Sequence, residues 1–203
     1  MSEWKWKKGW LYGPTITHVK ASGAEKMPGC CAKDNFRRVT FHNEGVSRQC
    51  QPGHVESLAR YVRDQRIWYT FLFCDRCPEI AQVCQTGRAA RAMKGGSVCP
   101  AGNSANRHGK FNIQVCLAGR GSDKTKPFAE WPDEVKTFLR KLHNKCEIPA
   151  KAMPWDKAVR SAEKWRNPAK GYAFHSHGPT DDHTDCLEQK WSFKKYKQNI
   201  LGL

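Results

Sequence analysis

The sequence predicts an α/β fold, with a single domain whose central mixed β-sheet is flanked by helices. Segments rich in β-branched and aromatic residues alternate along the chain with segments whose apolar residues recur at helical spacing. Apolar residues occupy 39% of the 203 positions, which is enough to build a buried core at a length typical of one domain. Strands that alternate with helices are typical of a sheet covered by helices.

The predicted strands are short and apolar. The first covers 36–42 (Phe-Arg-Arg-Val-Thr-Phe-His) and is stopped by Asn-Glu-Gly. Two nearly continuous apolar runs follow at 67–74 and 80–85, and a fourth strand is expected at 111–118. Runs this apolar indicate strands that are covered on both faces.

Three amphipathic helices are expected between and after these strands. Apolar residues recur at i, i+3, i+4 and i+7 within the helix expected at 54–65. The same spacing occurs at 135–142, where Pro-Asp-Glu forms a good first turn, and at 155–162 after a proline. The remaining ends are predicted as a basic, Trp-rich irregular arm at 1–35 and a basic C-terminal tail or short helix at 190–203, which leaves 36–189 as the domain.

The chain is strongly basic. Its 35 Lys and Arg residues against 19 Asp and Glu residues give a net charge of +16, which predicts an anionic partner or environment. Nucleic acid, a phosphate-rich bacterial envelope and an acidic membrane surface all fit this charge. The longest apolar stretch, 67–74, is far shorter than the roughly 20 residues of a membrane-spanning helix. No apolar segment follows the basic N-terminus, so a secretory signal is not expected.

Ten cysteines do not form an obvious disulfide framework. Several lie in apolar, strand-like runs, where a free thiol behaves as a small hydrophobic group, and a reducing cytosol would keep them as thiols. Cys74 and Cys77 form a Cys-x-x-Cys pair, but a closed zinc site needs four ligands and no second pair matches it. A strand end followed by a turn at Pro78 is the favoured interpretation.

The segment 174–186 concentrates groups that bind metals. It contains three of the eight histidines and three aspartates around a Gly-Pro turn, and imidazole with carboxylate is a suitable zinc set. A catalytic zinc keeps three protein ligands, so a third is expected from elsewhere. His42 is the best candidate, because it ends the first strand and active sites of α/β sheets gather at that edge. A solvated polar turn, and a histidine hydrogen-bonded at a strand end, remain the alternatives.

Five segments in order resemble the zinc-dependent N-acetylmuramoyl-L-alanine amidases shared by phage endolysins and peptidoglycan recognition proteins. The similarity covers about 39–186 and is closest to lysins of phages that infect actinobacteria. The segments are 39–45 (Val-Thr-Phe-His-Asn-Glu-Gly), 68–73 (Trp-Tyr-Thr-Phe-Leu-Phe), 88–92 (Arg-Ala-Ala-Arg-Ala), 106–119, which begins with an Asn-Arg-x-Gly-like turn, and 175–185 (His-Ser-His-Gly-Pro-Thr-Asp-Asp-His-Thr-Asp).

The resemblance implies a set of site residues. The zinc ligands would be His42, His175 and Asp185. Tyr69 matches a tyrosine placed near the metal-bound water, and His183 matches a residue that steadies the developing oxyanion. Glu44 is expected to orient His42 through its second ring nitrogen, since metal-bound imidazoles need such a partner.

The sequence also departs from the family pattern. Thr70 replaces a histidine that commonly follows the tyrosine, and Cys116 stands where one branch keeps a glutamate. Cys186 replaces the proline after the last ligand and is an alternative ligand to Asp185, because thiolate binds zinc well. His177 falls on a position that the family does not use as a ligand, so a hydrogen-bonding or solvated role is expected for it.

The implied function is zinc hydrolysis of the amide bond between N-acetylmuramic acid and L-alanine in peptidoglycan, by a monomeric phage endolysin. Such an enzyme would be made in the host cytoplasm and reach the cell wall after holin-type release, with its charge attracted to anionic wall polymers and no specific nucleic acid as partner. Two alternatives stay open: a catalytically weakened peptidoglycan-binding protein on the same fold, and a basic nucleic-acid-binding protein that uses its Lys, Arg and Trp residues.

Overall fold

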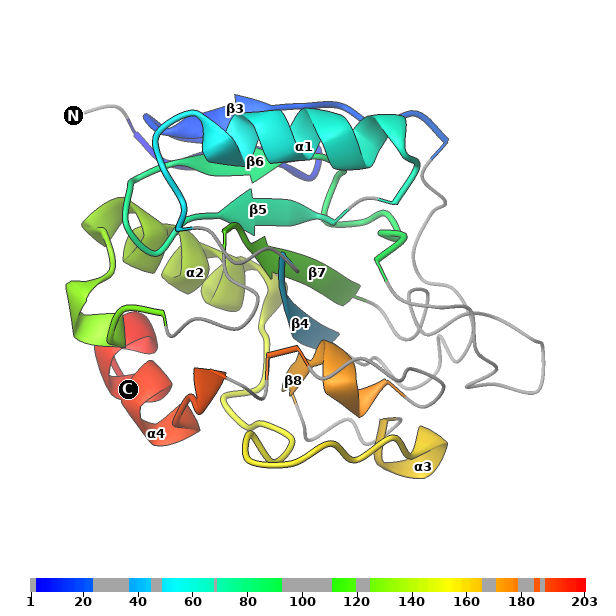
Figure 1. Cartoon of the computed structure of the whole chain (residues 1–203), viewed down its shortest axis with the longest axis vertical. Helices are drawn as coiled ribbons and strands as arrows, with labels where there is room; N and C mark the ends of the chain where they lie inside the picture. The colour runs from blue at the N-terminus through cyan, green and yellow to red at the C-terminus, as the bar shows by residue number, and fades with distance from the viewer. Residues whose placement is uncertain are drawn as a thin grey trace.

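A six-stranded mixed sheet organises the protein (Figure 1). The computed structural model describes residues 3–23, 37–44, 49–67, 69–92, 111–119, 125–165, 171–178, 185–186 and 189–203. In spatial order the strands are β3 (Ile16–His18), β6 (Ile80–Gln82), β5 (Phe71–Phe73), β7 (Phe111–Leu117), β4 (Arg37–Asn43) and β8 (Tyr172–Phe174). The β5–β6 pair is antiparallel and the other neighbours are parallel. The predicted mixed α/β sheet is therefore confirmed.

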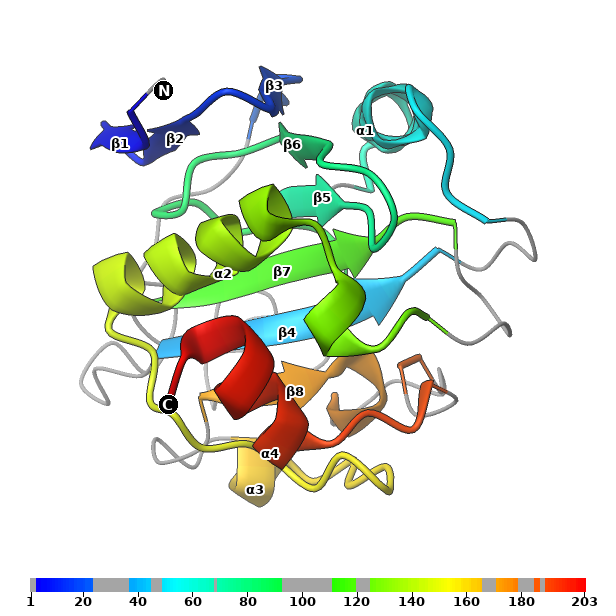
Figure 2. The ribbon, with the colours of Figure 1, turned by 90° about the vertical axis from the view of Figure 1, so that its left-hand side faces the viewer.

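Helices cover the sheet on both faces. Helix α1 (His54–Asp64) packs on one face, and α2 (Asp133–Cys146) packs on the other together with α4 (Phe193–Tyr196) and the π-helical turn Lys197–Leu201 (Figure 2). The shorter elements are α3 (Ala162–Trp165) and the 3-10 turns Phe128–Glu130 and His175–His177. No described helix has the length and hydrophobicity needed to cross a bilayer.

Side chains on the central strands alternate between the two faces. On β4, Val39 and Phe41 enter the core beneath α2, and Val115 on the neighbouring β7 does the same. Cys116 points to the opposite face and joins the core beneath α1. His42 is adjacent to Phe41 in sequence and therefore lies on the α1 face, because successive residues of a strand point to opposite faces. The sheet thus offers a polar surface beside α1.

The strands expected at 67–74 and 80–85 exist but are shorter, as β5 and β6. Both runs are covered on both faces, as their apolar character predicts: Phe71 and Phe73 lie in the core beneath α2, and Leu72 and Cys74 lie in the core beneath α1. The turn expected after Cys77 also occurs.

The helix expected at 155–162 is wrong, because only Ala162–Trp165 is helical in this region. Trp155 lies in an aromatic cluster, with ring centroids 5.9 Å from Phe41 and 4.8 Å from Phe174. Arg160 adopts a positive φ of 42°, which is incompatible with a continuous right-handed helix. Tertiary packing of the tryptophan overrides the local helical spacing.

Both chain ends are more ordered than the expected arm and tail. β1 (Lys5–Lys7) and β2 (Trp10–Tyr12) form an antiparallel hairpin, and β3 adds a strand to the central sheet. Residues 24–35 of the expected arm lie outside the described residues. At the other end, Tyr196 and Ile200 are buried in the main core. Buried apolar side chains in both segments explain why they pack onto the domain.

Candidate metal centre

The register of two parallel strands places two histidines side by side. Phe41 on β4 pairs with Phe174, the last residue of β8, so the residues that follow them, His42 and His175, both lie at the carboxyl edge of the sheet. Their ring centroids are 4.4 Å apart, and both side chains are buried. Residues that are 133 positions apart in sequence thus meet through strand pairing alone.

Asp185 completes the cluster. The Ser176 N–H donates to the Asp185 carbonyl at 3.0 Å, which holds this segment against the end of β8. The Asp185 Oδ1 lies 3.1 Å from His175 Nδ1, and its Oδ2 lies 3.7 Å from His42 Nδ1. One ligand atom from each of the three residues fits within 4.8 Å of the others. The structure therefore brings together the three residues predicted as metal ligands.

The electrostatics keep Asp185 ionised. Burial alone would raise the pKa of this carboxyl, but the hydrogen bond with His175, the nearby His42 and the Asn43 N–H lower the pKa below its ordinary value. The Asn43 N–H lies 3.4 Å from Oδ2. A carboxylate is the protonation state that a metal ligand requires.

Gln114, rather than Glu44, supports His42. The Gln114 Oε1 lies 2.5 Å from His42 Nε2, and an amide oxygen only accepts, so Nε2 carries a proton; in the neutral imidazole Nδ1 then keeps its lone pair on the Asp185 side. Glu44 instead lies 2.9 Å from His54 Nε2 and accepts from the Gly119 N–H at 2.7 Å. The expected contact between Glu44 and His42 is thus replaced by Gln114, because β7 places Gln114 on the face that His42 shares.

Sequence reasoning missed Gln114, because its relation to His42 depends on the register of β4 and β7. Thr40 pairs with Gln114 and His42 pairs with Cys116, so Gln114 lies two residues before the β7 partner of His42 and on the same face. Thr70 helps to position this strand, because its Oγ1 accepts from the Gln114 N–H at 3.2 Å. The threonine that departs from the family pattern therefore has a structural contact with the strand that supports His42.

Tyr69 lies next to the cluster and faces a cleft. Its ring centroid is 5.1 Å from that of His42, and its side chain hydrogen-bonds Cys116. Burial, followed by the proximity of Cys116 and Asp185, raises the pKa of Tyr69 well above its ordinary value. The phenol therefore remains protonated at neutral pH and keeps a hydrogen to donate.

The cleft has a volume of about 590 Å³ and runs between α1 and the carboxyl ends of the central strands. Tyr69, Cys116 and Glu44 line it on the side of the strands, and α1 supplies most of the other wall, including the exposed Tyr61. A molecule bound in this cleft would have one end beside the His42 cluster.

Two further residues near the candidate ligands, His177 and Cys186, do not belong to the group of three. His177 is a buried structural residue: its Nδ1 accepts from the Phe174 N–H at 2.9 Å, and its Nε2 donates to the Lys157 carbonyl at 3.0 Å. Burial lowers the pKa of His177 to about 4. The alternative ligand Cys186 packs in the hydrophobic core beneath α2 and is not in the convergent group. His183 lies outside the described residues.

The donor set fits zinc. Two imidazoles and one carboxylate are typical of catalytic zinc sites, which leave a further position for water or substrate. The buried ligands, the supporting Gln114 and the cleft beside them are the features that a hydrolytic metal site needs.

Comparison with solved structures identifies the fold. The hydrolase AmiA from Staphylococcus aureus has a TM-score of 0.55 and 13% identity, over 94% of this chain and 83% of that chain. AmpD has a TM-score of 0.54 and 16% identity, over 96% and 98% of the two chains. A mutant endolysin from Bacillus subtilis has a TM-score of 0.52 and 15% identity, over 92% and 99%. No protein-family model matches the sequence, and no curated protein matches it. The likeness confirms, at the level of the fold, the resemblance detected in the sequence.

Proposed function

We propose that this protein is a zinc-dependent N-acetylmuramoyl-L-alanine amidase that hydrolyses the amide bond between N-acetylmuramic acid and L-alanine in peptidoglycan. The observation that carries the proposal is the convergence of His42, His175 and Asp185 beside a cleft that is lined by Tyr69 and Cys116. A fold shared with a hydrolase and an endolysin supports it.

The protein residues would hold the metal and prepare the reaction. His42 and His175 would each offer Nδ1, and Asp185 would offer a carboxylate oxygen. Zinc in such a site lowers the pKa of bound water from about 15.7 toward roughly 7 and polarises a carbonyl oxygen. Gln114 fixes the tautomer of His42, while the Asn43 N–H and His175 keep Asp185 ionised.

Two further residues would act on the substrate. The protonated Tyr69 hydroxyl faces the cleft beside the ligands, where it can donate to the oxygen that becomes negatively charged when the amide is attacked. His183 is proposed as a second donor to this oxygen, on the basis of the sequence resemblance alone. The C–N bond then breaks, and the amine of L-alanine leaves with a proton that comes from the attacking water.

The biological setting is proposed as that of a phage endolysin. Such a lysin would be made in the host cytoplasm, released to the wall by a holin, and held there by attraction between its net charge of +16 and anionic wall polymers. The charge then serves localisation, and the reaction depends on the histidine cluster.

The test uses purified actinobacterial cell walls. We expect the protein to expose new L-alanine amino groups in these walls, and we expect a chelator to stop this release. Added zinc should restore the release, whereas magnesium, which prefers oxygen ligands, should not. Absence of release by the zinc-loaded protein, with wall binding retained, would favour the weakened binding protein. Salt-dependent DNA binding without wall binding would favour the nucleic-acid alternative.

Replacement of Gln114 by leucine tests the support of His42. The variant keeps the size of the side chain but removes the acceptor at Nε2, and we expect the zinc dissociation constant to rise about 10- to 100-fold. Competition with a chromogenic chelator measures it. Gln82→Leu is the matched control, because Gln82 is also a buried, hydrogen-bonded glutamine, on β6 away from the cluster. Equal zinc affinity in both variants would show that Gln114 does not support the metal.

A further inference from the structure

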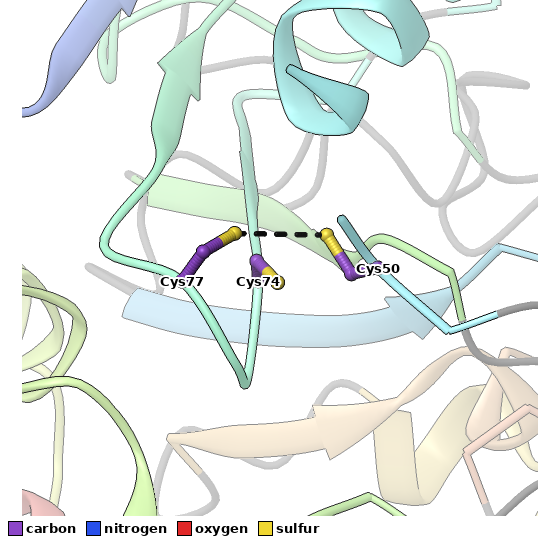
Figure 3. Close-up of side chains that lie close together, drawn as sticks. All are labelled: Cys50, Cys74 and Cys77. Atoms are coloured by element: carbon purple, nitrogen blue, oxygen red, sulfur yellow. Dashed lines mark hydrogen bonds between the residues drawn. The ribbon is translucent and has the colours of Figure 1, made fainter. Parts of the chain in front are cut away.

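Three cysteines converge at a second place in the fold, apart from the histidine cluster. The Sγ atoms of Cys50, Cys74 and Cys77 all lie within 4.8 Å of one another, and all three residues are buried. Cys50 and Cys77 have their sulfurs 4.0 Å apart, and Figure 3 shows Cys74 between them. Cys50 precedes α1, whereas Cys74 and Cys77 lie in the turn between β5 and β6.

A backbone N–H group in the turn between β5 and β6 donates a hydrogen bond to one of these sulfurs. The Arg76 N–H donates to the Cys74 Sγ at 3.3 Å, a contact that the Cys-x-x-Cys spacing makes possible within one turn. An N–H directed at sulfur stabilises the thiolate over the thiol. This hydrogen bond to Cys74 would not be needed if the three cysteines only packed as apolar side chains.

Cys50 is held at the cluster by close backbone packing. A Cβ atom added at Gly119 would lie 2.5 Å from the Cys50 nitrogen, so only glycine allows this approach, and Gly119 also has a positive φ of 78°. The Glu79 Oε1 accepts from the Gly53 N–H at 2.5 Å and ties the same segment to the strand after the turn. Contacts on both sides therefore keep Cys50 facing Cys77.

We propose that Cys50, Cys74 and Cys77 form a second metal site that binds zinc through three thiolates, with solvent as the fourth ligand. Thiolate is a preferred zinc ligand, and the tetrahedral ion accommodates three sulfurs and one oxygen. On binding, each thiol that is protonated releases its proton to solvent, so no oxidant is required. The bound ion would tie the start of α1, and hence one wall of the cleft, to the β5–β6 turn.

The other buried thiols differ from this cluster. Cys84 and Cys146 are buried as well, but among the described residues neither belongs to a group of three side chains that could hold a metal ion. Cys146 is therefore a suitable control for the loss of a buried thiol that does not bind metal.

Cobalt substitution of the full chain under reducing conditions tests the proposal. Thiolate ligands give Co²⁺ an intense charge-transfer absorption in the near ultraviolet that histidine and carboxylate ligands do not give. We expect this band in the wild type and its loss in Cys74→Ser and in Cys50→Ser. We expect Cys146→Ser and His175→Ala to retain it, and the latter result separates this site from the proposed catalytic site. Retention of the band in Cys74→Ser would overturn the proposal.

A measurement on the wild type keeps the test independent of how the variants fold. Alkylation followed by peptide mass spectrometry should show that Cys50, Cys74 and Cys77 react at least about 10-fold more slowly in the zinc-loaded protein than in the metal-free protein. All three thiols should be protected together, and none should be in a disulfide. A Cys50–Cys77 disulfide in protein purified under reducing conditions, or absence of both the cobalt band and the protection, would overturn the site whether or not the protein hydrolyses cell walls.

Discussion

The His175→Ala variant should lose hydrolysis of cell walls and one equivalent of bound zinc. His175 supplies one of three ligand atoms, and its loss also removes the contact at 3.1 Å that holds the Asp185 carboxylate. Because a catalytic metal supplies several kcal/mol of transition-state stabilisation, we expect kcat/KM to fall by about 10³-fold or more, which corresponds to about 4 kcal/mol. Amino-group release and metal analysis by mass spectrometry measure the two losses.

His18→Ala provides the control for this variant. His18 lies on β3, at the edge of the sheet opposite β8, and its ring contacts the Leu11 carbonyl at 2.9 Å. This variant should retain both zinc and hydrolysis. If His175→Ala hydrolysed walls at the wild-type rate, the histidine cluster would not be the reaction centre. If it kept its full zinc content but lost activity, His175 would act on the substrate instead of the metal.

The cluster of three candidate ligands could be predicted because its chemistry is concentrated in sequence. His175 and Asp185 lie in one segment rich in histidine and aspartate, and His42 ends a clearly apolar strand. Helices α1 and α2 could be predicted equally well from their amphipathic spacing, since each helix buries one continuous stripe of apolar residues. These features are local, and local patterns are visible without a structure.

Other features depend on contacts between distant segments and could not be predicted. Gln114 supports His42 only because β4 and β7 pair in a particular register, and nothing near Gln114 in sequence indicates a metal. Cys50 lies 27 residues from Cys77, so the Cys-x-x-Cys pair had no visible third partner. The expected helix at 155–162 failed for the same reason, because Trp155 is placed by aromatic packing against Phe41 and Phe174.

The Tyr69→Phe variant should bind zinc normally and hydrolyse its substrate poorly. The substitution keeps the ring, which packs 5.1 Å from that of His42, and removes only the hydroxyl beside Cys116. Loss of one donor to a developing oxyanion typically costs about 10²- to 10³-fold in kcat. We therefore expect kcat to fall by about 10²-fold while KM and zinc content change little, because the interaction forms only in the transition state.

Tyr61→Phe separates this role from simple binding in the cleft. Tyr61 lines the same cleft from α1, but its side chain is exposed, and it belongs to the wall opposite the ligands. Loss of its hydroxyl should leave kcat unchanged. A rise in KM alone for Tyr69→Phe would mean that Tyr69 binds the substrate in the ground state. A wild-type kcat for this variant would mean that Tyr69 takes no part in the reaction. A selective fall in kcat would instead show that the Tyr69 hydroxyl acts in the transition state, where a protonated phenol beside the Asp185 carboxylate can stabilise a new negative charge.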